Sequence, residues 1–580
     1  MTYKKQLEKR VLAGLLAGAA LWLGMPAALA ASGAVPNTQL PDGGQFIGGN
    51  TVGSIDTSGA QMTITQNVQN AVIQWDGGFN VGANATVNFV SEKSGYNTLN
   101  YDASGNMSQI YGAINANNNG NIYIVNPAGV EISSSAQINV GSLYVSNKKM
   151  GTEDFTAFRD NAAGKDFVLG GTTTDAVLMS LGNINAANVT FDGGRIVIDT
   201  ERLKNGDDKM EAGSIHVRTT DAGQVVLGYD GYDNGYGTTK DASDLASVTD
   251  GKGNAITDLK GYMWVEDIEQ LQAVNTNPSG QYALRNSIDA TATQDWVDKS
   301  GTGKGFVSIG SDGEGNSFTG KFDGLDYNIF NLNIDRNTDN VGLFGVVGNG
   351  AVIQNVTLVG GSIKGQSNVG ALAGSVQGSA QISNIMNSAS VTGSSDVGGI
   401  IGSAASTDQK TLVFKNLVNT GTVAGTAEGA ENNAGGLIGF LSGGTLSGTS
   451  YNLGGVTGSG ANVGGLVGTA SGATLGDGTN LIYNRLNVSG KYNVGGIVGS
   501  MTNTTVQNAE NSGNVTATGR TTEAYKYHTA HTFNDGNVVN GVRTETVNIA
   551  NAGGIAGYAY GVTIENCYYS GEVSAKNYAG

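Results

Sequence analysis

The chain has 580 residues, of which 92 are Gly, 5 Pro, 3 His and 1 Cys, and its formal net charge is −17. This composition excludes collagen, which needs abundant Pro, and a disulfide scaffold, which needs more than one Cys. The negative charge disfavours binding to nucleic acid, and the shortage of His and Cys disfavours a metal site built from such ligands. We therefore expect no cofactor, no metal ion and no nucleic-acid partner.

The N-terminus has the pattern of a secretory signal peptide. An apolar run at 11–23 is followed by the small residues that typically precede a cleavage site. The basic residues before the run are Lys4, Lys5, Lys9 and Arg10. The pattern predicts a signal peptide over residues 1–30, cleaved between Ala30 and Ala31. The alternative, a transmembrane anchor, needs about 20 apolar residues, and this run is shorter.

Residues 31–150 alternate short β-branched or apolar segments with turns rich in Gly and Asn. The segments are 62–66, 71–75, 86–89, 121–125 and 136–140. Their close spacing predicts the coils of a β-solenoid. The order of phrases such as Ala71-Val-Ile-Gln-Trp75 and Ile122-Tyr-Ile-Val-Asn-Pro-Ala-Gly-Val130 resembles the TPS (haemagglutination-activity) domain of filamentous-haemagglutinin-like two-partner secretion exoproteins.

This resemblance implies a fold and a route of export. The fold is a right-handed parallel β-helix, and the domain, placed at 31–150, directs export through an outer-membrane β-barrel transporter whose periplasmic POTRA domains bind it. The protein is then secreted through the periplasm to the surface of a Gram-negative bacterium. The family's short secretion motif maps to Asn126, Pro127, Gly129 and Val130, with Ala128 in place of the family's second Asn. These residues either contact the transporter or only shape one coil.

The β-helix is expected to continue through 151–260, with charged, Gly-rich loop insertions between its coils. Residues 261–330 form a joint, because apolar residues at helical spacing over 265–274 predict one short helix. A lead-in phrase follows at 317–334, and it resembles the segment that precedes GLUG repeats of bacterial surface proteins.

From 331 to 580 one phrase, typified by Asn493-Val-Gly-Gly-Ile-Val-Gly499, recurs at intervals of about 28 to 37 residues, with one longer step. It resembles the GLUG repeat, and the chain stops inside an eighth copy, as expected for a piece of a longer protein. Stacking such repeats predicts an elongated all-β solenoid, which we prefer to an array of β-sandwiches because hairpin signals are scarce. The first residues of the copies are expected to form a side-chain ladder: Asn340, Asn368, Asp396, Asn433, Asn462, Asn493 and Asn551.

Parallel β-helices also include polysaccharide-cleaving enzymes, which place carboxylates together for acid and base catalysis. Asp199 and Glu201 are two residues apart and could share a strand face, but no third carboxylate is patterned beside them, so we expect a surface pair at a strand end. His528 and His531 lie in an insertion without helical pattern or a third ligand. Cys567 has no His partner that the sequence indicates, so it is expected in the core or in a ladder. No catalytic residue is predicted.

The sequence therefore predicts a secreted surface adhesin. The N-terminal domain carries export, and the repeats form a stalk that binds a glycan or protein on a host or bacterial surface. The alternatives are a β-helical polysaccharide-active enzyme and the shaft of a contact-dependent toxin or haemolysin whose activity lies beyond residue 580.

Overall fold

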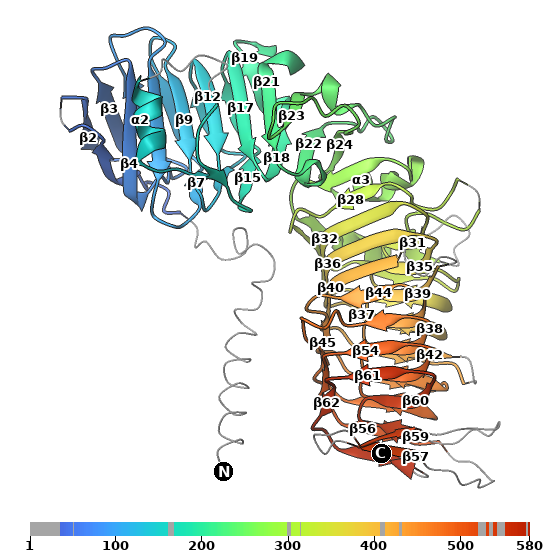
Figure 1. The fold of residues 1–580 in the computed structure, drawn as a ribbon. Coiled ribbons are helices and arrows are strands. Elements are labelled where there is room, and N and C mark those ends of the chain that lie inside the picture. Colours follow the sequence, from blue (N-terminus) through green and yellow to red (C-terminus); the bar gives the residue numbers. More distant parts are fainter. Residues whose placement is uncertain are drawn as a thin grey trace. The chain divides into compact units, whose positions relative to one another are not determined.

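The computed structural model describes residues 35–580 except 50, 161–167, 298–302, 314, 407–411, 429–431, 520–528, 533–537, 542–550, 576–577 and 580. The predicted cleavage site at Ala30 and Ala31 lies outside the described residues. The chain divides into two compact units, unit 1 (residues 1–231 and 239–263) and unit 2 (residues 232–238 and 264–580). Each is a stack of short parallel strands (Figure 1), which confirms the predicted all-β, parallel β-helical fold.

The strands of unit 1 form three stacked sheets, which we call columns. Most coils contribute one strand to each column. The first column is β1 (Asp42–Phe46), β4 (Asn70–Gly78), β6 (Asn97–Asp102), β9 (Asn121–Val125), β12 (Ser142–Ser146), β17 (Asn188–Gly193), β21 (Ile215–Thr219) and β23 (Ser247–Asp250). The second is β2 (Gly53–Ser58), β3 (Gln61–Gln66), β5 (Thr86–Val90), β8 (Ala113–Ala116), β11 (Gln137–Asn139), β16 (Asn183–Asn185), β19 (Leu203–Asn205) and β20 (Asp208–Lys209). The third includes β7 (Ser108–Ile110), β10 (Val130–Ile132), β15 (Val177–Ser180), β18 (Arg195–Asp199) and β22 (Val225–Tyr229).

The first coil of unit 1 is covered by two strands that run antiparallel to the strands they cover. Strand β1 pairs antiparallel with β4, and β2 pairs antiparallel with β3. The pairings that continue each column, such as β4 with β6, are parallel, except that β20 at the end of the second column pairs antiparallel with β19. An open strand edge is a template for pairing with other chains. The antiparallel strands occupy the edges of β3 and β4 that a preceding coil would otherwise fill.

Strand β9 is apolar on both faces of its sheet. Ile122 and Ile124 are fully buried, and Tyr123 and Val125, which alternate with them, are buried as well. Because successive side chains of a strand point to opposite faces, the sheet must be covered on both sides. The interior of the coil covers one side, and a helix covers the other.

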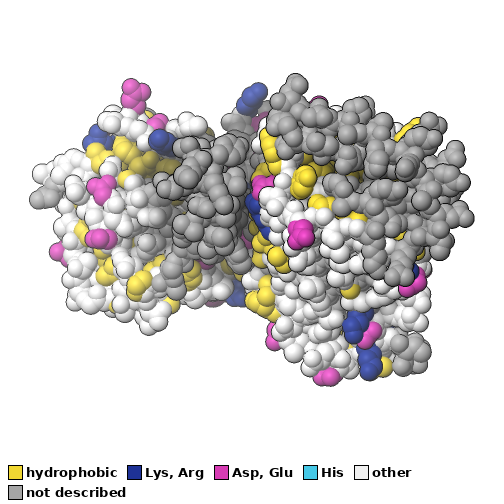
Figure 2. All heavy atoms as spheres, turned by 90° about the horizontal axis from the view of Figure 1, so that it is seen from below, with side chains coloured by type: hydrophobic (Ala, Val, Ile, Leu, Met, Phe, Trp, Pro, Cys, Tyr) yellow, Lys and Arg dark blue, Asp and Glu magenta, His cyan; other side chains and the backbone are white. Residues whose placement is uncertain are grey.

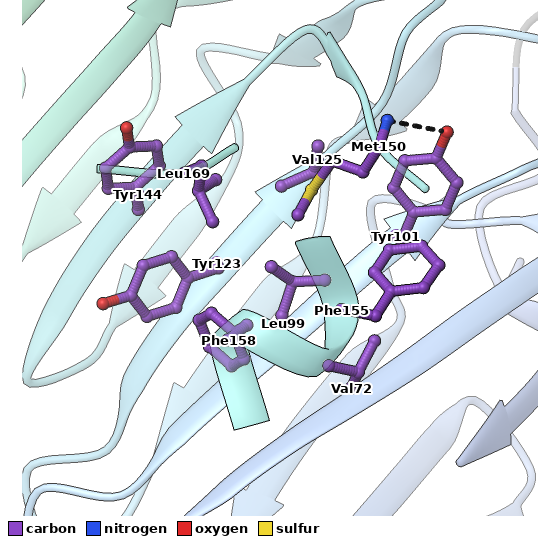
Figure 3. Close-up of a cluster of buried hydrophobic side chains, with 10 residues drawn as sticks. All are labelled: Val72, Leu99, Tyr101, Tyr123, Val125, Tyr144, Met150, Phe155, Phe158 and Leu169. Atoms are coloured by element: carbon purple, nitrogen blue, oxygen red, sulfur yellow. Dashed lines mark hydrogen bonds between the residues drawn. The ribbon is translucent and has the colours of Figure 1, made fainter. Parts of the chain in front are cut away.

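That helix is α2 (Thr152–Asp160), which lies against the outer face of the first column (Figure 3). Phe155 and Phe158, three residues apart on one helical face, enter the buried cluster. The ring of Phe158 meets that of Tyr123 edge to face at 4.9 Å. The whole cluster is Val72, Leu99, Tyr101, Tyr123, Val125, Tyr144, Met150, Phe155, Phe158 and Leu169. Helix α2 was not predicted, and it adds a second layer to a wall that solenoids usually leave exposed to solvent.

Unit 2 begins near α3 (Ile268–Ala273), the one helix predicted from sequence, which Asp267 caps by accepting a hydrogen bond from Gln270 N–H. Its columns rise through seven or more coils. One column is β34 (Ser367–Gly370), β38 (Ser395–Gly398), β42 (Asn433–Gly435), β47 (Asn462–Gly464), β52 (Asn493–Gly495), β59 (Asn551–Gly553) and β64 (Tyr578–Ala579). Another contains β32 (Ala351–Val359), β36 (Ala380–Asn387), β40 (Leu412–Asn419), β45 (Tyr451–Asn452), β50 (Ile482–Asn484), β55 (Ala509–Asn511) and β62 (Tyr568–Tyr569).

The described surface carries few charges, and they are dispersed. On the face drawn in Figure 2, acidic and basic side chains stand among uncharged ones rather than gathering in a patch of one sign. Among the described residues, no helix has both the length and the apolar character that crossing a membrane requires.

Candidate functional site

The predicted secretion motif forms the turn that joins β9 to β10, and its first residue is fully buried. The Asn126 amide donates hydrogen bonds from Nδ2 to the Asn106 carbonyl at 2.7 Å and to Ser108 Oγ at 2.9 Å. Its Oδ1 accepts a hydrogen bond from Ala128 N–H at 2.8 Å. The side chain thus ties its own turn to the preceding coil, and its bond to the fully buried Ser108 is shielded from water.

Gly129 is required by the same turn. Its φ is +104°, and its N–H donates to the Asn126 carbonyl at 2.9 Å. A Cβ at this position would lie 2.7 Å from the Val177 carbonyl oxygen of the following coil. Val130 then begins β10, fully buried, and pairs with Ser108 on one side and Leu178 on the other.

Beneath the turn, a buried carboxylate extends the polar network towards the first coil. Asp102 accepts hydrogen bonds from Ser108 Oγ at 2.6 Å and from Phe79 N–H at 2.8 Å, both through Oδ2. Its other oxygen accepts from Ser104 N–H at 3.0 Å. With Asn126 also bonded to Ser108, the network joins residues from three successive coils of unit 1.

The exposed part of the motif is small. Pro127 and Ala128 are half-buried, and the Pro127 carbonyl accepts a hydrogen bond from Thr174 Oγ1 at 2.7 Å. These two residues are the part of the turn that a partner protein could reach. The motif therefore separates into a buried half that holds the coil and an outer half that is open to contact.

We expect Asn126→Ala to lower the free energy of unfolding of unit 1 by about 2–3 kcal/mol, because it removes three hydrogen bonds of a fully buried amide group, one of them to the buried Ser108 hydroxyl. Pro127→Ala removes only half-buried ring atoms and keeps the carbonyl that Thr174 contacts, so its effect is expected within about 0.5 kcal/mol. Urea unfolding of both variants measures the difference. Equal stabilities of the two variants would contradict the structural role of Asn126.

Beside the α2 cluster lies an ion pair that is almost excluded from solvent. Lys148 Nζ contacts Asp192 Oδ2 at 2.8 Å, and the two side chains are only 11% and 8% exposed. The same oxygen accepts a hydrogen bond from Tyr144 OH at 2.5 Å, and Lys148 also donates to the Leu169 carbonyl at 2.9 Å. Burial, and secondarily the adjacent Asp192 carboxylate, raises the pKa of Tyr144 well above its ordinary value. Burial alone raises the pKa of Tyr123 to about 12.

The raised pKa of Tyr123 predicts a loss of stability at alkaline pH. Its contribution is complete below the ordinary tyrosine pKa of 10.0 and is lost as the pH rises through about 12, because the folded state resists ionisation of this hydroxyl. We expect Tyr123→Phe, which keeps the ring in the cluster, to abolish about 2 kcal/mol of the loss that the parent chain shows between about pH 9 and about pH 12. Urea unfolding of both chains at the two pH values tests this, and identical pH slopes would refute it.

In unit 2, the predicted ladder residues stand above one another at the start of successive strands. Nδ2 of Asn368 donates to Oδ1 of Asn340 at 2.8 Å, and Nδ2 of Asn433 to Oδ1 of Asp396 at 2.5 Å. The row continues from Asn462 to Asn433, from Asn493 to Asn462 and from Asn551 to Asn493, at 2.9, 2.9 and 3.0 Å. We name these residues the corner row. Each of these bonds runs from a later coil to an earlier one.

A second row of Asn side chains, which was not predicted as a ladder, lies in the interior of unit 2. Its members are Asn387, Asn419, Asn452, Asn484 and Asn511, all fully buried, and we name them the inner row. Each Nδ2 donates to the next Oδ1 at 2.8–2.9 Å, and these bonds run from an earlier coil to a later one. The signal was present in the recurring phrase Asn-x-x-Asn at 384–387 and 416–419, whose second Asn repeats with the coil.

The inner row explains the paired glycines of the repeat. A Cβ on Gly465 would lie 2.6 Å from Cγ of Asn484, and one on Gly436 would lie 2.5 Å from Cγ of Asn452. A Cβ on the second glycine of the phrase would thus meet both a backbone carbonyl oxygen of the next coil and an amide group of the inner row. In each of these coils, one Gly of the repeat phrase lies against one Asn of the inner row.

The residues considered for catalysis do not converge. Asp199 is fully buried at the end of β18 and accepts a hydrogen bond from Glu201 N–H at 3.1 Å, whereas the Glu201 carboxylate turns to Lys209 Nζ at 2.6 Å. The expectation that the two carboxylates form a surface pair is therefore wrong for Asp199, which caps a turn. Cys567 donates to the Val506 and Glu565 carbonyls, and burial raises its pKa to about 11, which disfavours the reactive thiolate.

The other candidates also lack a catalytic arrangement where they can be seen. His528 lies outside the described residues. His216 is half-buried on β21 and alternates with the buried Ile215 and Val217. In the described part of the chain, no three His, Cys, Asp or Glu residues come together in a way that could hold a metal ion.

These features define a parallel β-helical protein whose buried polar networks join neighbouring coils to one another. The family model of the TPS secretion domain matches residues 37–255. Residues 37–255 therefore carry a TPS secretion domain, the domain of two-partner secretion exoproteins that the sequence resembles. The match covers both segments that were predicted separately, 31–150 and 151–260. Residues 256–389 match the model of the M26 IgA1-specific metallo-endopeptidase N-terminal region.

Curated relatives share parts of the chain. A heme/hemopexin-binding protein of Haemophilus influenzae is 28% identical over 229 residues, which are 40% of this chain and 23% of the relative. Halomucin of Haloquadratum walsbyi is 30% identical over 241 residues, 38% of this chain and 2% of the relative. The chain thus spans less than a quarter of either relative. The solved HMW1 secretion domain of Haemophilus influenzae is similar at a TM-score of 0.24 and 15% identity, over 82% of this chain and 94% of that one.

Proposed function

We propose that unit 1 delivers the chain to a cognate outer-membrane β-barrel transporter of a Gram-negative cell, whose POTRA domains bind it, and that unit 2 then serves as an adhesive stalk on the cell surface. The match of the TPS secretion domain to residues 37–255 is the observation that carries the export role. The exposed half of the Asn126 turn, Pro127 and Ala128, is the proposed point of contact. A secretory signal peptide at 1–30 supplies the first export step.

Export is tested in cells that produce the chain together with its transporter. Ala128→Arg changes a half-buried side chain at the proposed contact, and Gln137→Arg makes the same change at an exposed position of β11. We expect Ala128→Arg to reduce both the secreted fraction and the capture of the purified chain by the POTRA domains, and Gln137→Arg to reduce neither. If Ala128→Arg and Asn126→Ala, tested as separate variants, were both fully secreted, the export role of this turn would be contradicted.

The adhesive role is supported by the architecture of unit 2. Its described coils repeat the same buried rows, so that the outward-facing side chains are free to differ from coil to coil. We expect cells that display the chain to bind host cells or neighbouring bacteria, and cells that display it without residues 331–580 to lose this binding. Equal binding by both would place adhesion outside the repeats.

A second candidate follows from the match of residues 256–389 to an N-terminal region of M26 metallo-endopeptidases. In that case the chain supports a peptidase activity against an immunoglobulin-like substrate. Incubation of the complete gene product with IgA1, with and without a chelator, distinguishes the two. Chelator-sensitive cleavage favours the peptidase, and intact IgA1 favours the adhesin.

A further inference from the structure

One side of unit 2 carries half-buried aromatic and exposed aliphatic side chains on neighbouring coils. They lie in or just after strands β45 and β50, beside β55 of the next coil; β45 is seen in Figure 1 at the edge of the stack. Leu453 and Leu486 are 37% and 46% exposed, although both are large and apolar. With Tyr451, Tyr483, Arg485 and Glu510 they form a surface that we name the Tyr483 stripe.

The stripe is rigid and presents ring edges rather than ring faces. Tyr451 and Tyr483 are paired in register, and their rings stack at 4.6 Å with an angle of 3° between the planes. The Arg485 guanidinium lies 4.6 Å from the centroid of the Tyr483 ring. Because Tyr451 and Arg485 both lie against the Tyr483 ring, a sugar has little room to stack on that ring, whereas the ring edges, hydroxyls and adjoining leucines suit a protein surface.

The stripe also carries one charge of each sign on successive coils. Glu510 follows Tyr483 in register, and its carboxylate receives a hydrogen bond from Arg485 Nη1 at 2.5 Å. Both side chains of this pair remain about one-third exposed, at 36% and 31%. Each group therefore keeps an open side from which a second, opposite charge can approach.

We propose that the Tyr483 stripe is an interface between two copies of this chain, whose stacks associate side by side and antiparallel. Contacts along the stripe repeat at the spacing between strands, about 4.8 Å, and a second stack of the same kind matches that spacing over several coils. A twofold axis that passes between the coils of Arg485 and Glu510 places each Arg485 opposite Glu510 of the other copy. Tyr, Arg and exposed Leu then form the buried centre of the interface, and this pairing extends beyond the export and adhesion proposed above.

The test uses sedimentation velocity of the purified chain and of two charge variants, Arg485→Glu and Glu510→Arg. We expect the parent chain to dimerise and each variant alone to be monomeric, because each places like charges opposite one another. An equimolar mixture of the two is expected to dimerise again, since one copy then presents two acidic groups and the other two basic groups. Mixing cannot restore the pair within either chain, so recovery reports contact between copies.

A matched pair of apolar variants gives a second readout. Leu486→Ser lies on the stripe, and Val307→Ser removes a side chain of similar exposure, 47%, elsewhere in unit 2. We expect Leu486→Ser to weaken dimerisation at least tenfold and Val307→Ser to leave it unchanged. A monomeric parent chain, a mixture of charge variants that stays monomeric, or equal effects of the two Ser variants would each overturn the proposal. Because the readout is the mass of purified protein, a failure here is distinct from a failure of export.

Discussion

Gly465→Ala is expected to disrupt the coil in which it lies, at a cost of about 4 kcal/mol or more. The new Cβ would stand 2.0 Å from the Gly496 carbonyl oxygen and 2.6 Å from Cγ of Asn484, and both neighbours are held by bonds to further coils. Relief would require the ladder and the backbone to move together, which a close-packed interior resists. Urea unfolding and the loss of hydrogen-exchange protection around residues 462–500 measure the effect.

Gly455→Ala is the matched control for this prediction. It lies in the preceding repeat, and a Cβ there would meet no atom within 4 Å. We expect its unfolding free energy to stay within about 0.5 kcal/mol of the parent, or to rise slightly through the reduced freedom of the unfolded chain. If both alanines proved equally harmless, the amide–glycine contact would not be the reason for the paired glycines.

Asn452→Ala is expected to cost about 3–4 kcal/mol, because one fully buried side chain makes four hydrogen bonds. Its Nδ2 donates to Asn484 Oδ1 and to the Gly454 carbonyl, and its Oδ1 accepts from Asn419 Nδ2 and from Gly454 N–H. In a stack where each coil contacts only its neighbours, the loss is local, so amide exchange should accelerate in the coils of Asn419 and Asn484 first.

Asn487→Ala serves as the comparison, since this Asn is exposed and accepts a single hydrogen bond, from Asn514 N–H at 3.1 Å. We expect it to cost about 1 kcal/mol or less. If Asn487→Ala cost as much unfolding free energy as Asn452→Ala, the large effect at Asn452 could not be attributed to the burial of the inner row.

The repeat pattern predicted the parallel stack well, because a phrase that recurs with each coil must stack like residues on like. The corner row followed from the same reasoning, since its Asn begins each phrase. The inner row did not, although Asn387 and Asn419 stand in a recurring phrase, because their burial depends on which face of a short strand points inward. One residue of shift in register would have placed them in water.

Two features of unit 1 could not be predicted from the sequence, for related reasons. Helix α2 is short and polar overall, and only Phe155 and Phe158 anchor it, so its pattern is too brief to distinguish from a loop. The burial of Asn126 depends on Ser108 and Asn106, which belong to the preceding coil. In both cases the deciding contact is made by residues distant in sequence, which no local pattern encodes.

The two rows of Asn in unit 2 also constrain how such a protein changes length. In the corner row Asn433, Asn462 and Asn493, and in the inner row Asn419, Asn452 and Asn484, each donate to one neighbouring coil and accept from the other, and the two rows run in opposite directions. Removing or duplicating one whole repeat, as unequal recombination between similar gene segments does, rejoins both rows with every donor and acceptor matched. Removing part of a repeat leaves one row broken inside the core. The stack is thus free to lengthen or shorten in evolution, but only by whole coils.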